Sequence, residues 1–412
     1  MNVKLGIIRD LMAECDGSFY LYDESVISRQ VSTLKENFPS FEFLYSVKAN
    51  PFPPVVGYLA SQGFGADAAS SQEVCISGSA GLTCEKILYS TPGKTRSDIE
   101  TALDKAVIVA DSYNELILIN DAARKKGLHV KAGLRINAGF SMDGGDEGLS
   151  SKFGVDEHTL SKHRDFLNSF SNITVSGIHV HLKSQVLDHS KLSRYYRRIF
   201  ELALFCREEI GLDVEFINFG GGLGITYSSA ADAPLDIAAL GKECEELALA
   251  YNRKLNARLL IETGRFAVCE AGLYVTRIAD IKESMGAKYL VVEKGLNGFS
   301  RPSIAELIAS YAGGSGLKGS EPLFTTKDAF DFMIPGGDES ALEKVSIVGS
   351  LCTATDIMVK DALLPKAKIG DLVIVSKAGS YSYSLSPVLF ASHPLPFQFY
   401  LKTDGQVLPA DH

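Results

Sequence analysis

The chain has 412 residues, 46% of them hydrophobic and 22% charged, and a formal net charge of −9. This length exceeds that of a typical single core and predicts two domains, while the composition is ordinary for a soluble globular protein. The acidic balance argues against a nucleic-acid partner, and no apolar run approaches the roughly 20 residues that span a bilayer.

The amino-terminal segment and the cysteines both predict a cytoplasmic protein. Asp10 and Glu14 follow closely behind Lys4, which is unlike a signal peptide. The seven cysteines are scattered and contain no C-x-x-C pair. Such spacing favours reduced thiols over disulfides or zinc ligands.

Short apolar runs alternate with amphipathic stretches in the first two-thirds of the chain. The runs predict strands at residues 41–47, 64–68, 86–90, 106–110, 130–137, 173–181, 214–219 and 258–262. The stretches between them include predicted helices at 71–79, 114–126 and 195–209. Eight β-α alternations over about 240 residues predict an α/β fold of the (β/α)8 TIM-barrel type. The alternative is a doubly wound sheet, whose glycine fingerprint should come early, whereas the glycine cluster here lies at 220–224.

Beyond Gly264 the pattern changes to strands with long, turn-rich connections. The predicted strands lie at 273–279, 289–292, 345–348, 372–376 and 397–401. They predict a β-rich second domain, which the apolar run 19–22 is expected to join. The expected domains are a barrel over residues 24–268 and a β-domain over 1–23 and 269–412. The glycine-rich segment 310–337 is predicted to be a loop or lid.

Lys48 stands at the end of the first apolar barrel run, just before Asn50 and Pro51 stop the strand. Burial of an unpaired ammonium is costly, so such a lysine reaches solvent, forms a buried ion pair or serves as a chemical amine. The chemical interpretation is a Schiff base with a carbonyl cofactor.

The carboxyl ends of barrel strands converge on one face, where active sites lie. Those ends carry Lys48, Asp67, Asp111, Arg135, His181, the glycines 220–222 and Glu262. With Lys48, three features would suit a phosphorylated pyridine aldehyde: glycine amides for the phosphate, Glu262 for the ring nitrogen and His181 to stack on the ring. Each also has a plainer interpretation, as a turn, an arginine partner or a core histidine.

Four ordered motifs carry a resemblance to a known family. They are Tyr-Ser-Val-Lys-Ala-Asn at 45–50, His-Val-His at 179–181, Asn-Phe-Gly-Gly-Gly at 218–222 and Glu-Thr-Gly-Arg at 262–265. The set resembles the pyridoxal-phosphate-dependent decarboxylases of the alanine-racemase-like fold, which include ornithine, arginine and diaminopimelate decarboxylases. The resemblance covers roughly residues 19–401. It implies pyridoxal 5'-phosphate as cofactor and a homodimer whose two sites each borrow residues from the partner subunit.

The resemblance also implies roles for individual residues. Lys48 would form the Schiff base, Glu262 would bind the pyridine nitrogen and His181 would stack on the ring. Further cofactor contacts, most of them to the phosphate, would come from Ser184, Gly221, Gly222, Gly264, Arg265 and Tyr381. Asp67 and Glu73 would form a supporting acidic pair near the lysine, and Arg135 would support the cofactor from the fifth strand.

The segment Gly-Ser-Leu-Cys-Thr-Ala-Thr-Asp at 349–356 resembles the family's second signature. By this resemblance Cys352 reaches the neighbouring subunit's site and delivers the proton that replaces carbon dioxide. A carboxylate at the pyridine nitrogen keeps the ring a strong electron sink, so Glu262 favours decarboxylation over racemisation.

The residue after the signature cysteine narrows the substrate. Diamine and diaminopimelate decarboxylases carry an acid there that pairs with a distal ammonium, whereas Thr353 has no charge. The Leu-Cys-Thr pattern resembles decarboxylases of butirosin and siderophore synthesis, whose amino-acid substrates are conjugated at the far end, in one case to a carrier protein. Arg301, Thr353 and Asp356 are expected to contact the substrate. Lys183 departs from the glycine common in relatives.

Several functional hypotheses follow. The favoured one is a decarboxylase of a conjugated or acidic amino acid in siderophore or antibiotic biosynthesis. A primary-metabolism decarboxylase of diaminopimelate, ornithine or lysine is disfavoured by Thr353, and a non-catalytic binding relative by the intact Lys48, Glu262 and Cys352. A metal-dependent hydrolase is considered because His179 and His181 share a strand face, but such enzymes place that pair on the first strand, and no metal is expected.

Overall fold

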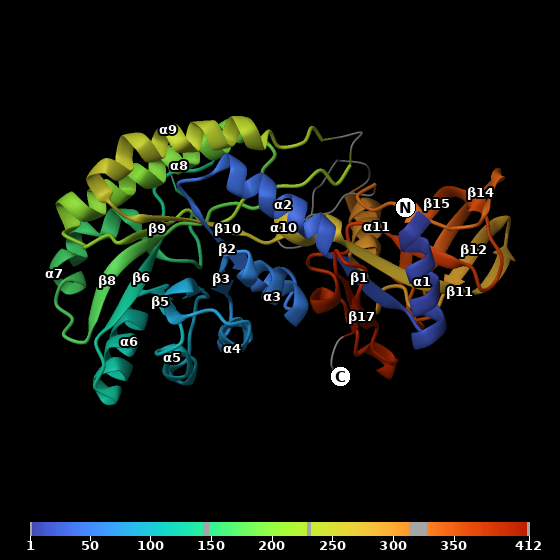
Figure 1. The fold of residues 1–412 in the computed structure, drawn as a ribbon, viewed down its shortest axis with the longest axis horizontal. Coiled ribbons are helices and arrows are strands. Elements are labelled where there is room, and N and C mark those ends of the chain that lie inside the picture. Colours follow the sequence, from blue (N-terminus) through green and yellow to red (C-terminus); the bar gives the residue numbers. More distant parts are fainter. Residues whose placement is uncertain (1, 143–147, 229–231, 313–327, 410–412) are drawn as a thin grey trace. The chain divides into compact units, whose positions relative to one another are not determined.

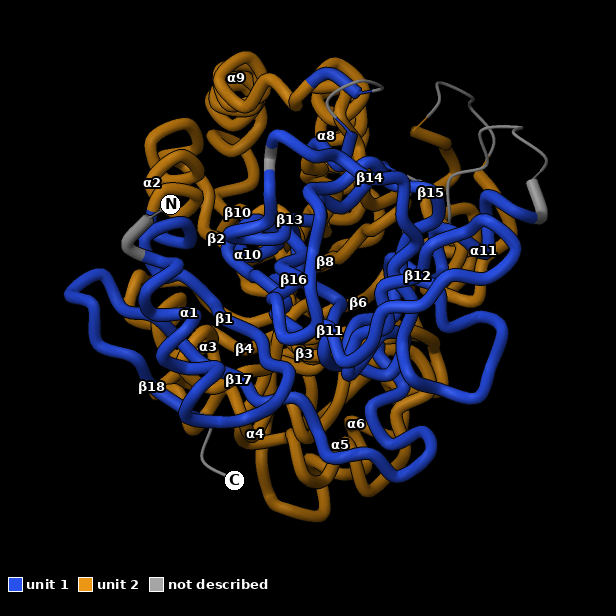
Figure 2. Tube along the Cα trace, turned by 90° about the vertical axis from the view of Figure 1, so that its right-hand side faces the viewer, with its two compact units in different colours: residues 1–28, 226–233, 268–412 blue, residues 29–225, 234–267 orange. Residues whose placement is uncertain are grey.

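A computed structural model of the chain describes residues 2–142, 148–228, 232–312 and 328–409. By its internal contacts the chain divides into two compact units, coloured in Figure 2. Unit 2, the barrel unit, contains residues 29–225 and 234–267; unit 1, the β unit, contains 1–28, 226–233 and 268–412. Residues 226–233 thus group with the β unit, although the sequence pattern does not set them apart from the barrel. The domain limits 24–268, and 1–23 with 269–412, stay a prediction.

The barrel unit is built on a closed parallel sheet (Figure 1). Its strands are β2 (Glu42–Ser46), β3 (Gly65–Ala68), β4 (Ile87–Tyr89), β5 (Val107–Ala110), β6 (Val130–Asn137), β8 (Ile173–His179), β9 (Phe216–Asn218) and β10 (Arg258–Thr263). They neighbour one another in chain order, and the pairings of β10 with β2 and of β5 with β6 complete the ring. The two-residue β7 (Val155–Asp156) is added beside β6. Each barrel strand overlaps a predicted run, so the TIM-barrel prediction is confirmed and the doubly wound alternative is wrong.

Side chains fill the interior of the barrel. Leu44, Leu88, Val109, Phe216 and Leu260 form its buried apolar cluster. Two glycines make room for the largest of them: a Cβ on Gly177 would lie 2.3 Å from the Phe216 ring, and one on Gly133 would lie 2.9 Å from it. Glycine is therefore required at these strand positions by close packing rather than by a turn.

Helices alternate with the barrel strands. They are α2 (Glu24–Asn37), α3 (Pro53–Ser61), α4 (Ser71–Ser79), α5 (Arg96–Ala102), α6 (Tyr113–Lys126), α7 (Arg164–Leu167), α8 (His189–Phe205), α9 (Ile237–Leu255) and α10 (Arg265–Val268). The side chains of Ser70 and Ser112 cap α4 and α6, which is why the predicted starts of these helices agree with the structure. α8 and α9 pack side by side (Figure 1).

The predicted helix 195–209 is wrong at both ends. α8 already begins at His189, because the Asp188 side chain accepts hydrogen bonds from the N–H groups of Ser190 and Lys191. At the other end, Cys206–Ile210 continues as a π-helix rather than as α-helix. In the described residues, no helix has the length and hydropathy needed to cross a membrane.

The β unit contains a mixed sheet with the strand order β15-β14-β12-β11-β1-β17-β18, and β16 pairs with both β11 and β13. Its strands are β1 (Phe19–Asp23), β11 (Gly272–Ser284), β12 (Ala287–Val292), β13 (Phe332–Met333), β14 (Asp338–Val348), β15 (Ile357–Lys366), β16 (Leu372–Val375), β17 (Phe397–Leu401) and β18 (Val407–Pro409). β1 lies between β11 and β17, so the prediction that the early run joins this sheet is confirmed. Helix α1 (Asn2–Cys15) packs Ile8, Leu11 and Met12 against it.

Sequence patterns miss several elements of the β unit: α1, β13, β15, β18 and the helix α11 (Ser300–Ala312). Pro302 lies in the first turn of α11, where its missing N–H has no helical partner to lose, so it does not break the helix. The predicted loop 310–337 is therefore wrong at its edges, since it includes the end of α11 and β13. Residues 313–327 of that segment lie outside the described residues.

Candidate active site

Lys48 lies in the short helical turn Val47–Ala49 that follows β2. Its Nζ lies 2.6 Å from Oδ2 of Asp67, whose side chain is fully buried at the end of β3. The lysine side chain itself is 42% exposed. The amine thus combines two of the expected alternatives: it pairs with a buried carboxylate and is still accessible to a reagent from solvent.

Asp67 is held on both oxygens. Ser90, one residue beyond β4, donates its hydroxyl to Oδ1 at 2.7 Å, opposite the Lys48 contact. Burial alone would raise the pKa of Asp67, but the Lys48 charge and the hydrogen bonds from Lys48 and Ser90 lower it. Asp67 is therefore ionised beside the ammonium. Sequence reasoning did not single out Ser90, since a lone serine after a strand carries no signal.

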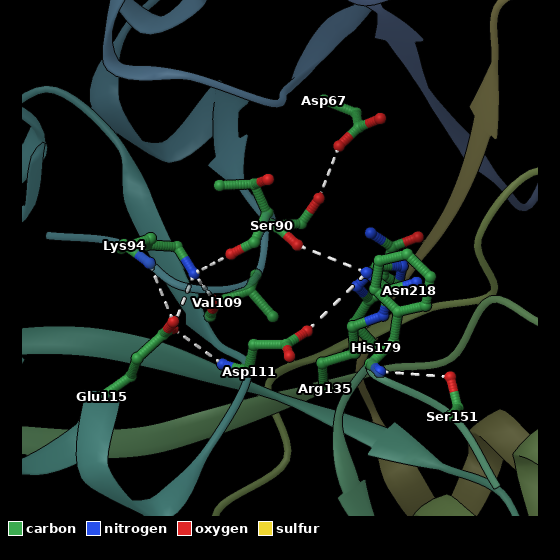
Figure 3. Close-up of polar contacts among 12 residues, drawn as sticks. Asp67, Ser90, Lys94, Val109, Asp111, Glu115, Arg135, Ser151, His179 and Asn218 are labelled. Atoms are coloured by element: carbon green, nitrogen blue, oxygen red, sulfur yellow. Dashed lines mark hydrogen bonds and ion pairs between the residues drawn. The ribbon is translucent and has the colours of Figure 1, made fainter.

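Arg135 and Asp111, two of the predicted strand-end residues, lie together in the barrel (Figure 3). Arg135 Nη1 lies 3.7 Å from Asp111 Oδ1 and donates to the main-chain oxygen of Ser90 at 3.5 Å. Burial raises the pKa of Asp111, with the Arg135 charge opposing it. Through Ser90, Arg135 is linked to the carboxylate that pairs with Lys48.

A buried ion pair between Lys94 and Glu115 lies beside Asp111 (Figure 3). Lys94 Nζ lies 2.8 Å from Glu115 Oε2, and the same oxygen accepts the Asp111 N–H at 2.9 Å. The ammonium also donates to the main-chain oxygens of Thr91 and Val109. These bonds fix the loop after β4 against the end of β5. The sequence around Lys94 is that of an exposed turn, so the pattern does not reveal this pair.

Glu262, on β10, is the second buried carboxyl of the site. Asn218 Nδ2 donates to its Oε1 at 2.8 Å, and His179 Nε2 lies 3.2 Å from the same oxygen without the angle of a hydrogen bond. Burial, followed by the charge of Asp67, raises the pKa of Glu262. A cationic ring nitrogen is the kind of partner that would reverse this shift and hold the carboxylate ionised.

His179 lies beside Glu262 at the end of β8, and its side chain is 2% exposed. Burial, followed by the positive charge of Arg135, lowers the pKa of His179 well below its usual range. The ring is therefore neutral. The first histidine of the His-Val-His motif is therefore buried against the Glu262 carboxyl. Asn218, which the sequence analysis quoted only as part of a motif, joins it in orienting the carboxyl.

His181 follows β8 and lies against the glycine loop 220–222. The Gly221 N–H donates to His181 Nδ1 at 3.1 Å, and His181 Nε2 lies 3.4 Å from Ser184 Oγ. Nδ1 therefore accepts the Gly221 N–H, while Nε2 faces the Ser184 hydroxyl. This network fixes the orientation of the imidazole.

The glycine loop follows β9. A Cβ on Gly220, which has φ +66°, would lie 2.5 Å from the Val180 main-chain oxygen, so this turn requires glycine. The Gly220 N–H donates to Asn218 Oδ1 at 2.9 Å, and the Gly221 N–H is taken by His181. Among the described residues no hydrogen bond engages the Gly222 N–H, which makes Gly222 the amide of this run best suited to a phosphate.

Three further predicted barrel residues lie near these strand ends. Gly264 directly follows β10, and the buried Arg265 opens α10. Glu73, in the first turn of α4, accepts the Ala69 N–H at 2.7 Å, and burial raises its pKa. Of the expected acidic pair, Asp67 therefore contacts the lysine directly, whereas Glu73 holds the chain after β3.

The signature turn of the β unit lies between β14 and β15. Cys352 is exposed in it, and the seven cysteines, all within the described residues, form no disulfide. Asp356 is buried: its Oδ1 accepts the Leu296 N–H at 2.6 Å and its Oδ2 accepts the Leu351 N–H at 2.9 Å. Asp356 thus shapes the turn that carries Cys352. A substrate contact for Asp356 stays a prediction.

Arg301 is fully buried in α11. Its Nη1 donates to the Ser380 main-chain oxygen at 3.3 Å, and its Cζ lies 4.9 Å and 5.2 Å from the ring centres of Tyr227 and Phe330. A substrate contact for Arg301 stays a prediction. The neighbouring Tyr381 is buried with φ +51°, a strained conformation of the kind that collects at functional sites.

The barrel residues fit the demands of pyridoxal 5'-phosphate. An accessible amine can take the aldehyde, and a buried carboxyl of raised pKa can face the ring nitrogen. A fixed imidazole, the Ser184 hydroxyl and the Gly222 amide lie beside them for the ring and the phosphate. The orientation of the carboxyl by Asn218 and His179 adds to this fit.

Comparisons with known proteins agree with this geometry. Residues 24–269 match the family model of the pyridoxal-dependent decarboxylases, pyridoxal binding domain. The L-glutamyl-[BtrI acyl-carrier protein] decarboxylase of Niallia circulans is 31% identical over 98% of this chain and 93% of its own length. The diaminopimelate decarboxylase of Aquifex aeolicus is 28% identical, over 92% of this chain and 85% of its own length.

Solved structures share the fold of this chain. The diaminopimelate decarboxylase from M. jannaschii in complex with L-lysine superimposes with a TM-score of 0.84 at 25% identity, covering 98% of this chain and 91% of that chain. The Helicobacter pylori enzyme with L-lysine gives a TM-score of 0.82 at 23% identity, over 98% and 95% of the two chains. The chain therefore belongs to the family of pyridoxal-phosphate-dependent decarboxylases with a TIM barrel and a β-domain, and it is a carboxy-lyase.

Proposed function

We propose that the protein removes the α-carboxylate of an L-amino acid whose distal end is conjugated or acidic, as a cytoplasmic homodimer serving siderophore or antibiotic biosynthesis. The observation that carries this proposal is the chemistry of the signature turn. Thr353 is uncharged, and its hydroxyl lies 2.9 Å from that of Thr355. Asp356, the one acid of the segment 349–356, has both oxygens occupied by main-chain N–H groups. Asp356 is also buried, so this turn offers no exposed carboxylate to a distal ammonium.

The similarity to a carrier-protein glutamyl decarboxylase supports the same proposal. The alternative, a primary-metabolism decarboxylase of diaminopimelate, ornithine or lysine, is supported by the comparable identity to diaminopimelate decarboxylases. A second alternative, a non-catalytic binding relative, would have no use for the Lys48–Asp67 pair and the oriented Glu262.

Each barrel residue is proposed to act on a particular part of the cofactor. Lys48 would hold the aldehyde carbon, Glu262 the ring nitrogen and His181 one face of the ring. Ser184, Gly222 and Arg265, with Tyr381 of the β unit, would hold the phosphate. When bound, pyridoxal 5'-phosphate supplies an electron-withdrawing ring that stabilises the charge left on the α-carbon as carbon dioxide departs.

The chain's own groups would control the protons. Lys48 must lose its proton before it can attack a carbonyl, and its exposed side allows that proton to pass to water while Asp67 stays ionised. Glu262 would keep a proton on the ring nitrogen. Cys352, exposed on the signature turn of the partner subunit, would deliver a proton to the α-carbon.

Carbon dioxide release from a panel of substrates tests the proposal. We expect kcat/KM for glutamate conjugated through its distal carboxyl, free or on a carrier protein, to exceed that for diaminopimelate, ornithine and lysine by about tenfold or more, the cost of roughly one unpaired distal charge. Equal or higher values for the three basic substrates would overturn the substrate proposal and leave the decarboxylase class intact.

The variant Thr353→Asp is the matched test of the turn. It places a carboxylate where relatives that act on basic substrates have one, so we expect it to raise kcat/KM for ornithine or lysine relative to the parent protein. The control is Thr355→Asp, which adds the same charge two residues away. If both variants leave the preference unchanged, Thr353 does not select the substrate.

A further inference from the structure

Gln185 follows Ser184 in the segment between β8 and α8, and its backbone adopts a left-handed conformation with φ +59°. A residue with a side chain rarely takes this conformation, because its Cβ crowds the backbone. Such a conformation persists where neighbouring contacts impose it, and it often marks a functional constraint. The contacts of Gln185 identify that constraint.

The Gln185 side chain binds the backbone of Ile225, which lies three residues after the glycine loop 220–222. Its Nε2 donates to the Ile225 main-chain oxygen at 2.5 Å, and the Ile225 N–H donates to its Oε1 at 3.2 Å. Both contacts use the two halves of a carboxamide, so the side chain pairs with Ile225 much as a neighbouring strand would.

The backbone next to Gln185 continues this pairing. The Val186 N–H donates to the Gly222 oxygen at 2.8 Å, and the Gly224 N–H donates to the Val186 oxygen at 3.1 Å. Val186 and Leu223 form an isolated parallel bridge. The contact is too close for side chains, since a Cβ on Gly224 would lie 2.8 Å from the Val186 oxygen. Residues 185–186 and the segment 222–225 are therefore joined by these hydrogen bonds.

The two proposed phosphate-binding residues, Ser184 and Gly222, each lie next to or within one of the joined segments. Ser184 directly precedes Gln185, and Gly222 accepts the first hydrogen bond of the paired segment. We propose that Gln185 is a positioning residue that fixes Ser184 and Gly222 relative to each other and so sets the grip on the phosphate of pyridoxal 5'-phosphate. This inference rests on the proposed phosphate role of Ser184 and Gly222.

Gln185→Met and Gln185→Gly separate this role from a general effect on folding. Methionine is uncharged and as long as glutamine, but it loses both hydrogen bonds. Glycine also loses them, and it relieves the strain of the positive φ. The full-length protein would be freed of coenzyme and titrated with pyridoxal 5'-phosphate and, separately, with phosphate-free pyridoxal. The visible absorption of the bound ligand gives both dissociation constants.

We expect both variants to bind pyridoxal 5'-phosphate about tenfold more weakly, the effect of losing roughly two modest hydrogen bonds. Binding of pyridoxal should change less than about twofold, because it makes no phosphate contact. Unchanged affinity for the phosphate form, or an equal loss for both ligands, would overturn the role of Gln185. If the methionine variant does not fold, the glycine variant carries the test, because it removes strain.

The Ser184→Ala variant distinguishes a failure of the positioning role of Gln185 from a failure of the proposed phosphate site. If this variant lowers the preference for the phosphate form but the Gln185 variants do not, Gln185 alone is rejected. If Ser184→Ala also leaves that preference unchanged, the proposed phosphate site itself fails, and the inference about Gln185 fails with it.

Discussion

At the scale of single residues, two buried carboxyls of the barrel have opposite electrostatic environments. Asp67 touches an ammonium and a hydroxyl, which lower its pKa, while burial and the nearby charge of Asp67 raise the pKa of Glu262. Opposed shifts of this kind assign different tasks to chemically identical groups. Asp67 is suited to hold a charge beside Lys48, and Glu262 is suited to share a proton with a ring nitrogen.

The Ser90→Ala variant tests the environment of Asp67. It removes a 2.7 Å hydrogen bond to a fully buried carboxylate, so we expect a loss of about 1–3 kcal/mol in the free energy of unfolding at neutral pH. The pKa of Asp67 is lowered in the folded protein. Its stabilising contribution is therefore present above the unfolded pKa of roughly 4 and is lost as pH falls toward the folded value.

Loss of the Ser90 hydroxyl raises the folded pKa, so acid unfolding should begin at higher pH in the variant. Urea unfolding at a series of pH values from acid to neutral measures both effects, and Ser90→Thr, which keeps the hydroxyl, is the control. Superimposable curves for the parent and alanine proteins would show that this hydrogen bond does not stabilise the carboxylate.

The motif-bearing residues of the site could be predicted, but their supports could not. Lys48, Glu262 and His181 stand in ordered motifs at the ends of apolar runs, so sequence alone indicates their face of the barrel. Ser90, Lys94 and Gln185 act through partners on another strand, helix or loop, and those partners become neighbours only when the barrel closes. No pattern along the chain encodes such a contact.

At the scale of elements, prediction succeeded where burial dominates the sequence. The barrel strands are short apolar runs because each is covered on both faces, so all of them could be found. Strand β15 was missed because most of its side chains are not buried, which leaves a polar sequence without clear alternation. The start of α8 was missed because it depends on the Asp188 cap. The cap binds the N–H groups of Ser190 and Lys191, which carry no apolar pattern.

The packing of the barrel strands can be tested at Gly177 on β8. An alanine there would place its Cβ 2.3 Å from the Phe216 ring, so we expect Gly177→Ala to lower the free energy of unfolding by about 1–3 kcal/mol. In the double variant with Phe216→Leu, the smaller side chain makes room for the alanine methyl group and should recover part of this loss in stability. Chemical denaturation measures both changes.

Gly57 in α3 provides the matched control. A Cβ there would meet nothing within 4 Å, and alanine favours the helix, so Gly57→Ala should be neutral or stabilising. If Gly177→Ala is tolerated as well as Gly57→Ala, close packing at Phe216 does not determine the choice of glycine in β8.

At the scale of the whole molecule, the proposed catalytic groups belong to different parts of the chain. Lys48 lies in the barrel unit and Cys352 in the β unit. The fold of each unit followed from its own pattern, apolar runs separated by helices in one and turn-rich strands in the other. The proposed homodimer rests on the family resemblance instead, because an interface between subunits leaves no periodic signal in a sequence.

A mixture of two inactive variants tests the proposed dimer with shared sites. Lys48→Ala and Cys352→Ala would be mixed after gentle dissociation and allowed to reassociate. If each site takes Lys48 from one subunit and Cys352 from the other, random pairing should restore about a quarter of the parent activity, since half of the dimers then hold one intact site. Activity that stays at the level of the separate variants would show that each site is complete within one chain.

The most direct test of the account is the identification of the residue that binds the cofactor covalently. The purified protein, loaded with pyridoxal 5'-phosphate, would be reduced with borohydride, digested and analysed by mass spectrometry. We predict a pyridoxyl group on Lys48, whose Nζ is accessible beside Asp67, and the loss of the bound cofactor's visible absorption in Lys48→Ala. A pyridoxyl group on another lysine, or unchanged absorption in Lys48→Ala, would contradict the central claim.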